Sequence, residues 1–188
     1  MQKLYNDFLE EYENLDHMEK INNGNLSTIN YYMRHHGVFK PDSTSTKLRV
    51  VFNASSLTTT GKSLNDVLLS GEINEDVFNI MLRFRKHQSV LIADIRQMFR
   101  QILIDPSQRD LLRILWKTKE EGPVAYRLKT VTYGTKCASF LATRVLRQLA
   151  MDEAKDFPLA SEVVLSDVYM DNIVTGSKDL GTAIVLKD

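Results

Sequence analysis

Several features that mark particular protein classes are scarce or missing in this sequence. A single cysteine, Cys137, excludes an internal disulfide and fits a reducing compartment. The four histidines and this cysteine show none of the spacings that zinc sites use. No apolar run approaches the roughly 20 residues of a membrane span, and the acidic start of the chain is unlike a signal peptide. We therefore expect no membrane contact and an intracellular rather than a secreted protein.

Net charge is also absent, because 24 Lys and Arg balance 24 Asp and Glu. The charge is unevenly distributed, however: residues 1–30 carry −4, residues 31–150 carry +9 and residues 151–188 carry −5. A basic centre between acidic ends is compatible with a surface that binds a polyanion. A solvated surface with uneven charge explains the same pattern and is the simpler interpretation.

Helix and strand patterns alternate along the 188 residues, a length typical of one domain. Apolar residues three or four positions apart predict helices over 5–21, 76–87 and 136–154. Extended segments are predicted at 29–40, 48–52, 89–94, 111–117 and 125–133. A loop is predicted at 55–66 and a Glu-Glu-Gly-Pro turn at 120–123. A hairpin is predicted at 163–176, around a turn at Asp171–Asn172. Helices interspersed with antiparallel strands indicate an α+β fold.

Two acids stand at the ends of apolar segments, where an unpaired charge is costly to bury. Asp94 closes the predicted strand "SVLIAD", and Asp171 lies at the tip of the predicted hairpin. If the two strands were neighbours, both carboxylates could share Mg²⁺, which prefers oxygen ligands. Two such ions can activate an attacking hydroxyl and stabilise a leaving oxygen. Taken singly, each acid is explained as well by a position at a strand end, and their 77-residue separation leaves the question open.

A series of sequence blocks follows one order between Tyr31 and Gly176. The blocks are "HHGVFKPDSTSTKLRVVFNAS", "SLNDVLL", "LRFRKHQSVLIADIRQMFRQILI", "RDLLRILWK", "YRLKTVTYGTKCASFLATRVLRQLA" and "FPLASEV…YMDNIVTG". Together they resemble the fingers and palm of a reverse transcriptase, most closely those of the BEL/Pao group of long-terminal-repeat retrotransposons.

The resemblance implies an α+β polymerase palm, an antiparallel sheet backed by helices, with part of the fingers and no thumb. It implies an N-terminal acidic helical segment at 1–30, a fingers and palm domain at 31–176 and the truncated start of a further element at 177–188. The implied activity is that of an RNA-directed DNA polymerase, which adds dNTPs to the 3′-hydroxyl of a primer on an RNA or DNA template. The thumb and ribonuclease H domains of the polyprotein would be absent from this chain, and the location would be a cytoplasmic virus-like particle or the nucleus.

The resemblance also assigns catalytic and metal-binding roles. Asp94, Asp171 and Asn172 would be the catalytic residues, and Asp94, Asp171 and the Ile95 carbonyl would hold two Mg²⁺ ions, with Mn²⁺ as a possible substitute. The family's last motif has Asp where this chain has Asn172, which keeps an oxygen ligand but loses the negative charge.

Nucleotide-binding and primer–template roles follow from the same resemblance. The implied residues are Lys47 and Arg49 at the triphosphate, Phe99 excluding a ribonucleotide's 2′-hydroxyl by its volume, Gly134 and Lys136 beneath the nascent base pair, and Tyr169 and Met170 beside primer and template. Simpler interpretations stay open: a charged edge strand for the two cations, a core aromatic for Phe99 and a loop-to-helix turn for Gly134.

A second function fits the same residues. With Asn172 in the last motif and no thumb, the chain is also interpreted as a catalytically inactive remnant that at most binds nucleic acid. A third interpretation, an unrelated α+β binding domain, requires all of the motifs to be coincidental.

Overall fold

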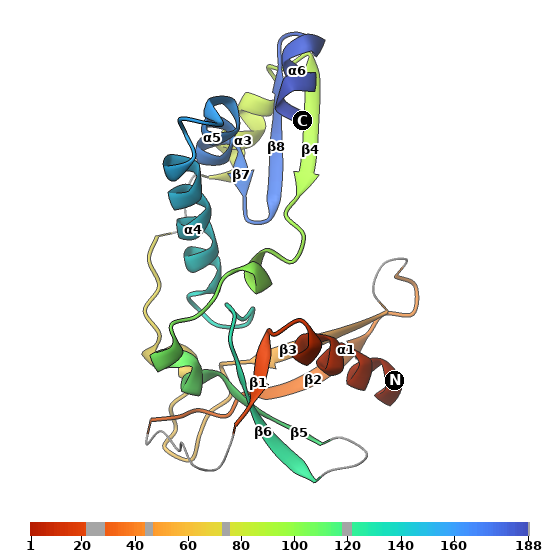
Figure 1. The fold of residues 1–188 in the computed structure, drawn as a ribbon, viewed down its shortest axis with the longest axis vertical. Coiled ribbons are helices and arrows are strands. Elements are labelled where there is room, and N and C mark those ends of the chain that lie inside the picture. Colours follow the sequence, from red (N-terminus) through yellow and green to blue (C-terminus); the bar gives the residue numbers. More distant parts are fainter. Residues whose placement is uncertain (22–28, 44–46, 73–75, 118–121, 188) are drawn as a thin grey trace. The chain divides into compact units, whose positions relative to one another are not determined.

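The structure, a computed structural model, describes residues 1–21, 29–43, 47–72, 76–117 and 122–187. Contacts divide the chain into two compact units (Figure 1). The first unit comprises Met1–Ser70 and Phe99–Ala138, and the second comprises Gly71–Met98 and Ser139–Asp188. Each unit combines helices with antiparallel strands, so the expected α+β class is confirmed. The segment expected at 31–176 contributes to both units.

The first unit contains two antiparallel sheets. One has the order β1-β6-β5, and the other consists of β2 and β3. The bounds of these strands are β1 Met18–Lys20, β2 Arg34–Phe39, β3 Leu48–Asn53, β5 Arg113–Lys117 and β6 Pro123–Leu128. The helix α1, Gln2–Asn14, contacts both β1 and β3. The helix predicted over 5–21 is wrong at its end, because Met18–Lys20 pair with β6 as a strand. The N-terminal acidic segment is therefore part of the packed first unit.

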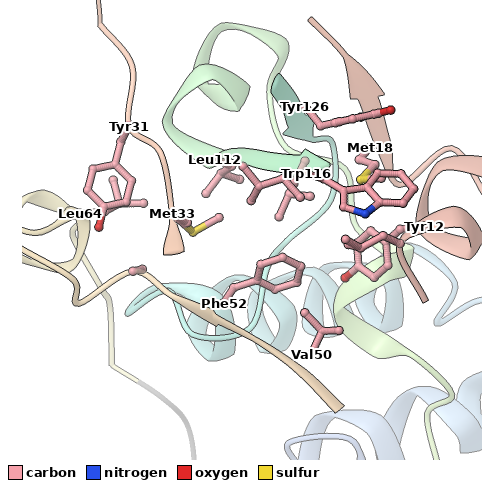
Figure 2. Packing of buried hydrophobic residues seen from close by; sticks show 14 of the residues in the cluster. Tyr12, Met18, Tyr31, Met33, Val50, Phe52, Leu64, Leu112, Trp116 and Tyr126 are labelled. Carbon is pink, nitrogen blue, oxygen red and sulfur yellow. The ribbon is translucent and has the colours of Figure 1, made fainter. Parts of the chain in front are cut away.

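A hydrophobic core joins α1 to these sheets (Figure 2). Leu9 and Tyr12, on one face of α1, are fully buried. In β3 the apolar residues Leu48, Val50 and Phe52 are buried, whereas the residues between them are more exposed. This alternation is typical of a strand with one face on a core, and it directs the other face of β3 away from the core.

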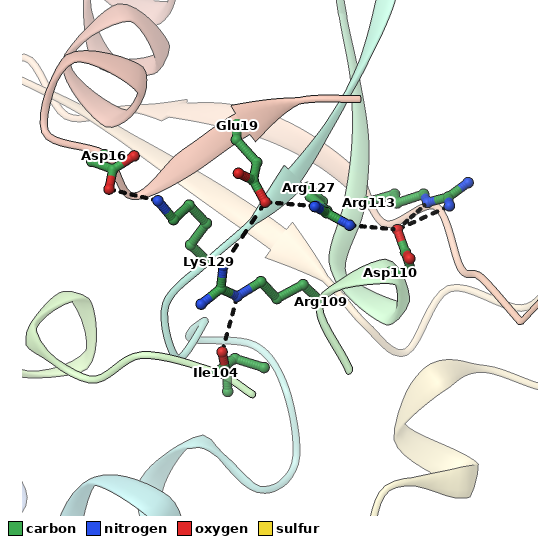
Figure 3. A network of polar contacts seen from close by, with 8 residues as sticks. All are labelled: Asp16, Glu19, Ile104, Arg109, Asp110, Arg113, Arg127 and Lys129. Atoms are coloured by element: carbon green, nitrogen blue, oxygen red, sulfur yellow. Dashed lines mark hydrogen bonds and ion pairs between the residues drawn. The ribbon is translucent and has the colours of Figure 1, made fainter. Parts of the chain in front are cut away.

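Acidic residues near the N-terminus pair with cations from the basic centre of the sequence. The ion pairs are Glu11–Arg100 at 3.1 Å, Asp16–Lys129 at 2.5 Å, Glu19–Arg127 at 2.6 Å and Glu19–Arg109 at 3.9 Å. Figure 3 shows the last three of them beside the pair of Asp110 with Arg113. Part of the basic centre is therefore matched within the first unit, which favours the simpler interpretation of the charge pattern.

The second unit contains a three-stranded antiparallel sheet of order β4-β8-β7 (Figure 1). The helices α3 and α5 contact β7 and β8, and α6 contacts β4 and β8. The bounds are β4 Ser89–Asp94, β7 Val168–Tyr169, β8 Asn172–Ser177, α3 Val77–Phe84, α4 Ala138–Asp152, α5 Pro158–Ser166 and α6 Leu180–Lys187. Arg83 of α3 forms an ion pair with the buried Asp167 at 3.1 Å, and Thr175 of β8 donates to the same carboxylate at 2.7 Å. These contacts fasten the helices to the sheet that carries the candidate metal ligands.

The hairpin predicted at 163–176 is wrong in two respects. Residues 163–166 are the end of α5, and the loop between β7 and β8 is Met170–Asp171 rather than Asp171–Asn172. A short apolar run with β-branched residues fits a strand or a buried helix equally well. Here Pro158 starts the helix, and the Ser161 hydroxyl donates to the Ala150 carbonyl at 2.7 Å, so packing against α4 decides for helix.

The loop expected at 55–66 contains the start of a short helix, α2, Leu64–Val67, because Ser63 and Asp66 form a reciprocal capping box. The Glu-Glu-Gly-Pro turn expected at 120–123 has its first two residues outside the described residues, so the turn itself stays a prediction.

Candidate functional site

The ends of β4 and β8 bring the two candidate metal ligands together. Asp94, the last residue of β4, lies directly opposite Asn172, the first residue of β8. The Ile95 amide also donates to the carbonyl of Asp171 at 2.7 Å. Directly opposed residues of an antiparallel pair have α-carbons about 4.5–5.5 Å apart. Asp94 and Asp171, 77 positions apart in the sequence, therefore lie at the same end of one sheet.

The turn that carries Asp171 has a distinctive backbone. Tyr169 pairs with Asn172, which leaves Met170 and Asp171 as a two-residue loop in which Met170 has a φ of 59°. A non-glycine residue in this left-handed conformation costs about 1–2 kcal/mol, which the pairing of β8 with both its neighbours offsets. Tyr169 is 43% exposed, whereas Met170 is half-buried. Of the two residues expected beside primer and template, Tyr169 is therefore the more accessible.

The polar groups at this end of the sheet offer oxygen atoms that could bind a metal. Few of these atoms are engaged by other residues. The exposed Asp94 carboxylate has no hydrogen-bond or ion-pair partner within the described residues. The Asn172 side-chain amide donates to Asp171 Oδ1 at 3.0 Å. The Ile95 carbonyl accepts from the Met98 amide at 3.2 Å and retains a second lone pair.

This donor set suits Mg²⁺, which commonly binds one or two carboxylates and completes its octahedron with water and substrate phosphates. Across the ranges that the structure describes, no cluster of three or more His, Cys, Asp or Glu side chains could hold a metal by itself. A metal at Asp94 and Asp171 would thus take its other ligands from carbonyl and amide oxygens, water and substrate.

The two cations expected at a triphosphate, Lys47 and Arg49, lie in the first unit, at and just before the start of β3. Arg49 is exposed between the buried Leu48 and Val50, and Lys47, one residue before the strand, is exposed as well. Neither side chain forms a hydrogen bond or ion pair with the described residues. Both cations are therefore accessible to an anionic ligand, although a charged strand edge would look the same.

Gly134 approaches the backbone of β3 rather than an open space. Its φ is +95°, and a Cβ built on it would lie 2.2 Å from the Phe52 carbonyl oxygen. Glycine is therefore required here by the protein's own packing, whatever ligand the loop meets. Lys136, two residues further, is exposed. Phe99 lies half-buried in the 3₁₀ turn Met98–Gln101, where the two units join along the chain.

Asn65, which no sequence pattern indicated, binds the backbone of this loop through its side chain. Asn65 Nδ2 donates to the Gly134 carbonyl at 3.1 Å, and Asn65 Oδ1 accepts from the Lys136 amide at 2.7 Å. The capping box in "SLND" is readable in the sequence and would have predicted α2. The contact of Asn65 with residues about 70 positions away has no local signal.

The adjacent histidines His35 and His36 lie on β2, within the extended segment predicted at 29–40. His35 is half-buried, stacks on Tyr5 at 5.8 Å between ring centroids and contacts the Tyr5 hydroxyl through Nδ1. His35 Nε2 donates to the Leu115 carbonyl at 2.9 Å, so Nδ1 is the acceptor for Tyr5. Burial lowers the pKa of His35 and raises the pKa of Tyr5 to about 12. These contacts give His35 a structural role that links α1, β2 and β5.

Comparison with known proteins adds no family assignment, since neither a family model nor a curated protein matches this chain. None of the helices in the described ranges has the length and apolarity needed to cross a membrane.

Proposed function

We propose that the chain is the palm and part of the fingers of a BEL/Pao-type RNA-directed DNA polymerase. The observation that carries the proposal is the register of β4 and β8, which brings Asp94 and Asp171 to the same end of one sheet. The Asp94 carboxylate is exposed and has no partner within the described residues, so a metal ion can reach it without displacing another protein group.

In this proposal Asp94, Asp171 and the Ile95 carbonyl hold the metal ions. Bound Mg²⁺ would lower the pKa of the primer 3′-hydroxyl and neutralise charge on the triphosphate. The chain itself contributes position and charge. Lys47 and Arg49 attract the triphosphate, with Arg suited to bidentate phosphate contacts.

The remaining expected residues act by shape. The half-buried Phe99 would limit the space at the sugar, and the exposed Tyr169 would contact the primer or template strand. Gly134 holds its loop close to β3 and so positions Lys136 near the start of α4. The proposed reaction transfers a nucleotide to the primer hydroxyl with release of pyrophosphate.

Asn172 sets the limit on activity. Its amide donates to Asp171 Oδ1, so a metal must compete for this oxygen or bind through Oδ2. An aspartate at this position would replace the donor by a second negative charge and strengthen cation binding. We therefore expect the wild-type protein to bind Mg²⁺ weakly and to be slow.

Primer extension on an RNA template, with Mg²⁺ or Mn²⁺, tests the proposal. Wild type should extend the primer, Asp94→Asn should lose at least about 100-fold of the rate, and Asn172→Asp should be faster. Asp156→Asn, which removes an exposed acid elsewhere in the second unit, is the matched control and should behave as wild type. Wild type and Asn172→Asp that both extend no primer would refute the polymerase proposal.

The hydrogen bond between Asn172 and Asp171 also favours the second candidate, an inactive remnant that binds nucleic acid. Thermal unfolding in increasing MgCl₂ separates the two without relying on activity. A metal site stabilises the folded state by RT ln(1 + [L]/Kd). In the polymerase, Mg²⁺ should raise the Tm of wild type and, more strongly, of Asn172→Asp, but not of Asp94→Asn. Retained nucleic-acid binding with no Mg²⁺ effect on any variant identifies the remnant.

A further inference from the structure

The Asn65 side chain joins three separate backbone or hydroxyl groups of the first unit. Its amide nitrogen donates to the Gly134 carbonyl at 3.1 Å and to the Ser55 hydroxyl at 2.8 Å. Its oxygen accepts from the Lys136 amide at 2.7 Å. One planar group thus satisfies a carbonyl and an amide on either side of Thr135, which only a side chain with both a donor and an acceptor can do.

Asn65 is itself held firmly. The capping box places Asp66 Oδ2 2.8 Å from both the amide and the hydroxyl of Ser63. The backbone amide of Asn65 donates to the Ala54 carbonyl at 3.0 Å, and the neighbouring Leu64 is only 2% exposed. The side chain of Asn65 therefore extends from a backbone that is fixed on both sides.

The loop that Asn65 binds is also fastened to β3. The Tyr133 hydroxyl donates to the Val50 carbonyl at 2.7 Å, and Gly134 lies against the Phe52 carbonyl. Without Asn65, these contacts would hold the beginning of the loop but not Lys136. The Thr135 hydroxyl donates to the Thr132 carbonyl at 2.7 Å and the Ala138 amide to the Thr135 carbonyl at 3.2 Å. Asn65 adds the bond to the Lys136 amide, which ties the end of the loop to α2.

Two lysines lie close to this clamp. Hydrogen bonds from Ser63 and, to a smaller extent, the charges of Lys62 and Lys136 lower the pKa of Asp66. Both lysines are therefore close to the helix that carries Asn65. Their side chains are exposed, like that of Arg49 on β3. The clamp thus fixes a backbone segment beside two exposed lysines.

We propose that Asn65 is a positioning residue for nucleotidyl transfer: it sets the Gly134–Lys136 backbone so that the loop meets the incoming dNTP in one geometry. The inference rests on the proposed polymerase function and adds a residue to it. Asn65 does not touch the reacting atoms. It acts through Gly134 and Lys136, so its loss should weaken nucleotide binding more than turnover.

Two variants of Asn65 and one control test this. Asn65→Ala removes donor and acceptor, whereas Asn65→Asp keeps the acceptor for the Lys136 amide and places a carboxylate beside the Gly134 carbonyl. Asn79→Asp introduces the same charge change at an exposed position of α3 in the second unit. Amide hydrogen exchange at Lys136, measured by NMR, reports the clamp independently of any activity. Single-nucleotide primer extension gives KM for the dNTP and kcat separately.

In Asn65→Ala we expect Lys136 exchange to accelerate at least about tenfold and KM to rise roughly tenfold while kcat changes less than about threefold. In Asn65→Asp the Lys136 amide should stay protected, and KM should rise because the Gly134 carbonyl is repelled. Asn79→Asp should change neither quantity.

Each contrary result has a distinct meaning. Unchanged Lys136 exchange in Asn65→Ala, or a fall in kcat that only follows the folded fraction with KM constant, overturns the role of Asn65 within an active polymerase. A wild-type chain that extends no primer refutes the polymerase function and, with it, the positioning role, even if Asn65 still controls Lys136 exchange.

Discussion

Replacing Gly134 by alanine tests whether the loop before α4 is held against β3. At a φ of +95°, the new Cβ would lie 2.2 Å from the Phe52 carbonyl oxygen. The left-handed backbone alone costs alanine about 1–2 kcal/mol. Carbon and oxygen at this separation lie far inside ordinary contact, so the loop or the strand must move, which adds about 1–3 kcal/mol. We expect Gly134→Ala to lower the free energy of unfolding by about 2–5 kcal/mol.

Gly61 provides the matched control, because its φ is +75° but a Cβ would meet nothing within 4 Å. Gly61→Ala should therefore lose only the backbone cost of about 1–2 kcal/mol. Alanine also reduces the entropy of the unfolded chain by about 0.4–1 kcal/mol in both variants, and this effect cancels in the comparison. The difference between the variants isolates the contact with Phe52.

Urea unfolding followed by circular dichroism measures both variants. The expected result is a difference of about 1–3 kcal/mol between them at equal m values. Equal losses would show that Gly134 is needed only for its dihedral angle. No loss in Gly134→Ala would mean that the loop is not packed on β3, and the geometry assigned to Lys136 would fail with it.

Three further predictions concern stability. Asp110→Asn should cost about 3–5 kcal/mol in urea unfolding, because it leaves the fully buried Arg113 without its 2.9 Å ion-pair partner; a loss below 1 kcal/mol would mean that Arg113 reaches water. Burial lowers the pKa of His35 in the folded state below its unfolded-state pKa of 6.5. The contribution of neutral His35 to the free energy of unfolding is therefore complete above pH 6.5 and is lost as the pH falls from 6.5 toward the folded-state pKa. His35→Gln should flatten that part of the stability-versus-pH curve, and an unchanged slope would contradict the assignment. Asp167→Asn should cost about 1–3 kcal/mol through its bonds to Arg83 and Thr175, and wild-type stability in that variant would show that these bonds are dispensable.

Local pattern predicted much of the secondary structure. The strand at 89–94 and the helix over 76–87 appear as β4 and α3, with bounds at or near those expected. The spacing in α3 matches the helical period and buries Ile80. The strand at 89–94 was expected to be buried because it is an apolar run, but none of its residues is buried, so that part of the prediction is wrong. The apolar residues at 163–166 match neither the helical nor the strand period alone, and the strand predicted there is wrong. Its helical state depends on the contact of Ser161 with α4, which lies outside any local window.

The candidate site divides in the same way. The acids at 94 and 171 were identified because an acid at the end of an apolar segment is unusual, and this is visible in the residues alone. The pairing of Asp94 with Asn172 and the bond from Asn65 to Lys136 are not visible there, since each joins residues about 70 or more positions apart. The sequence by itself determined the positions of most helices and strands and singled out the acids at 94 and 171. Only the tertiary structure decided which of them meet, because strand register and side-chain clamps are set by the burial of whole faces rather than by neighbouring residues.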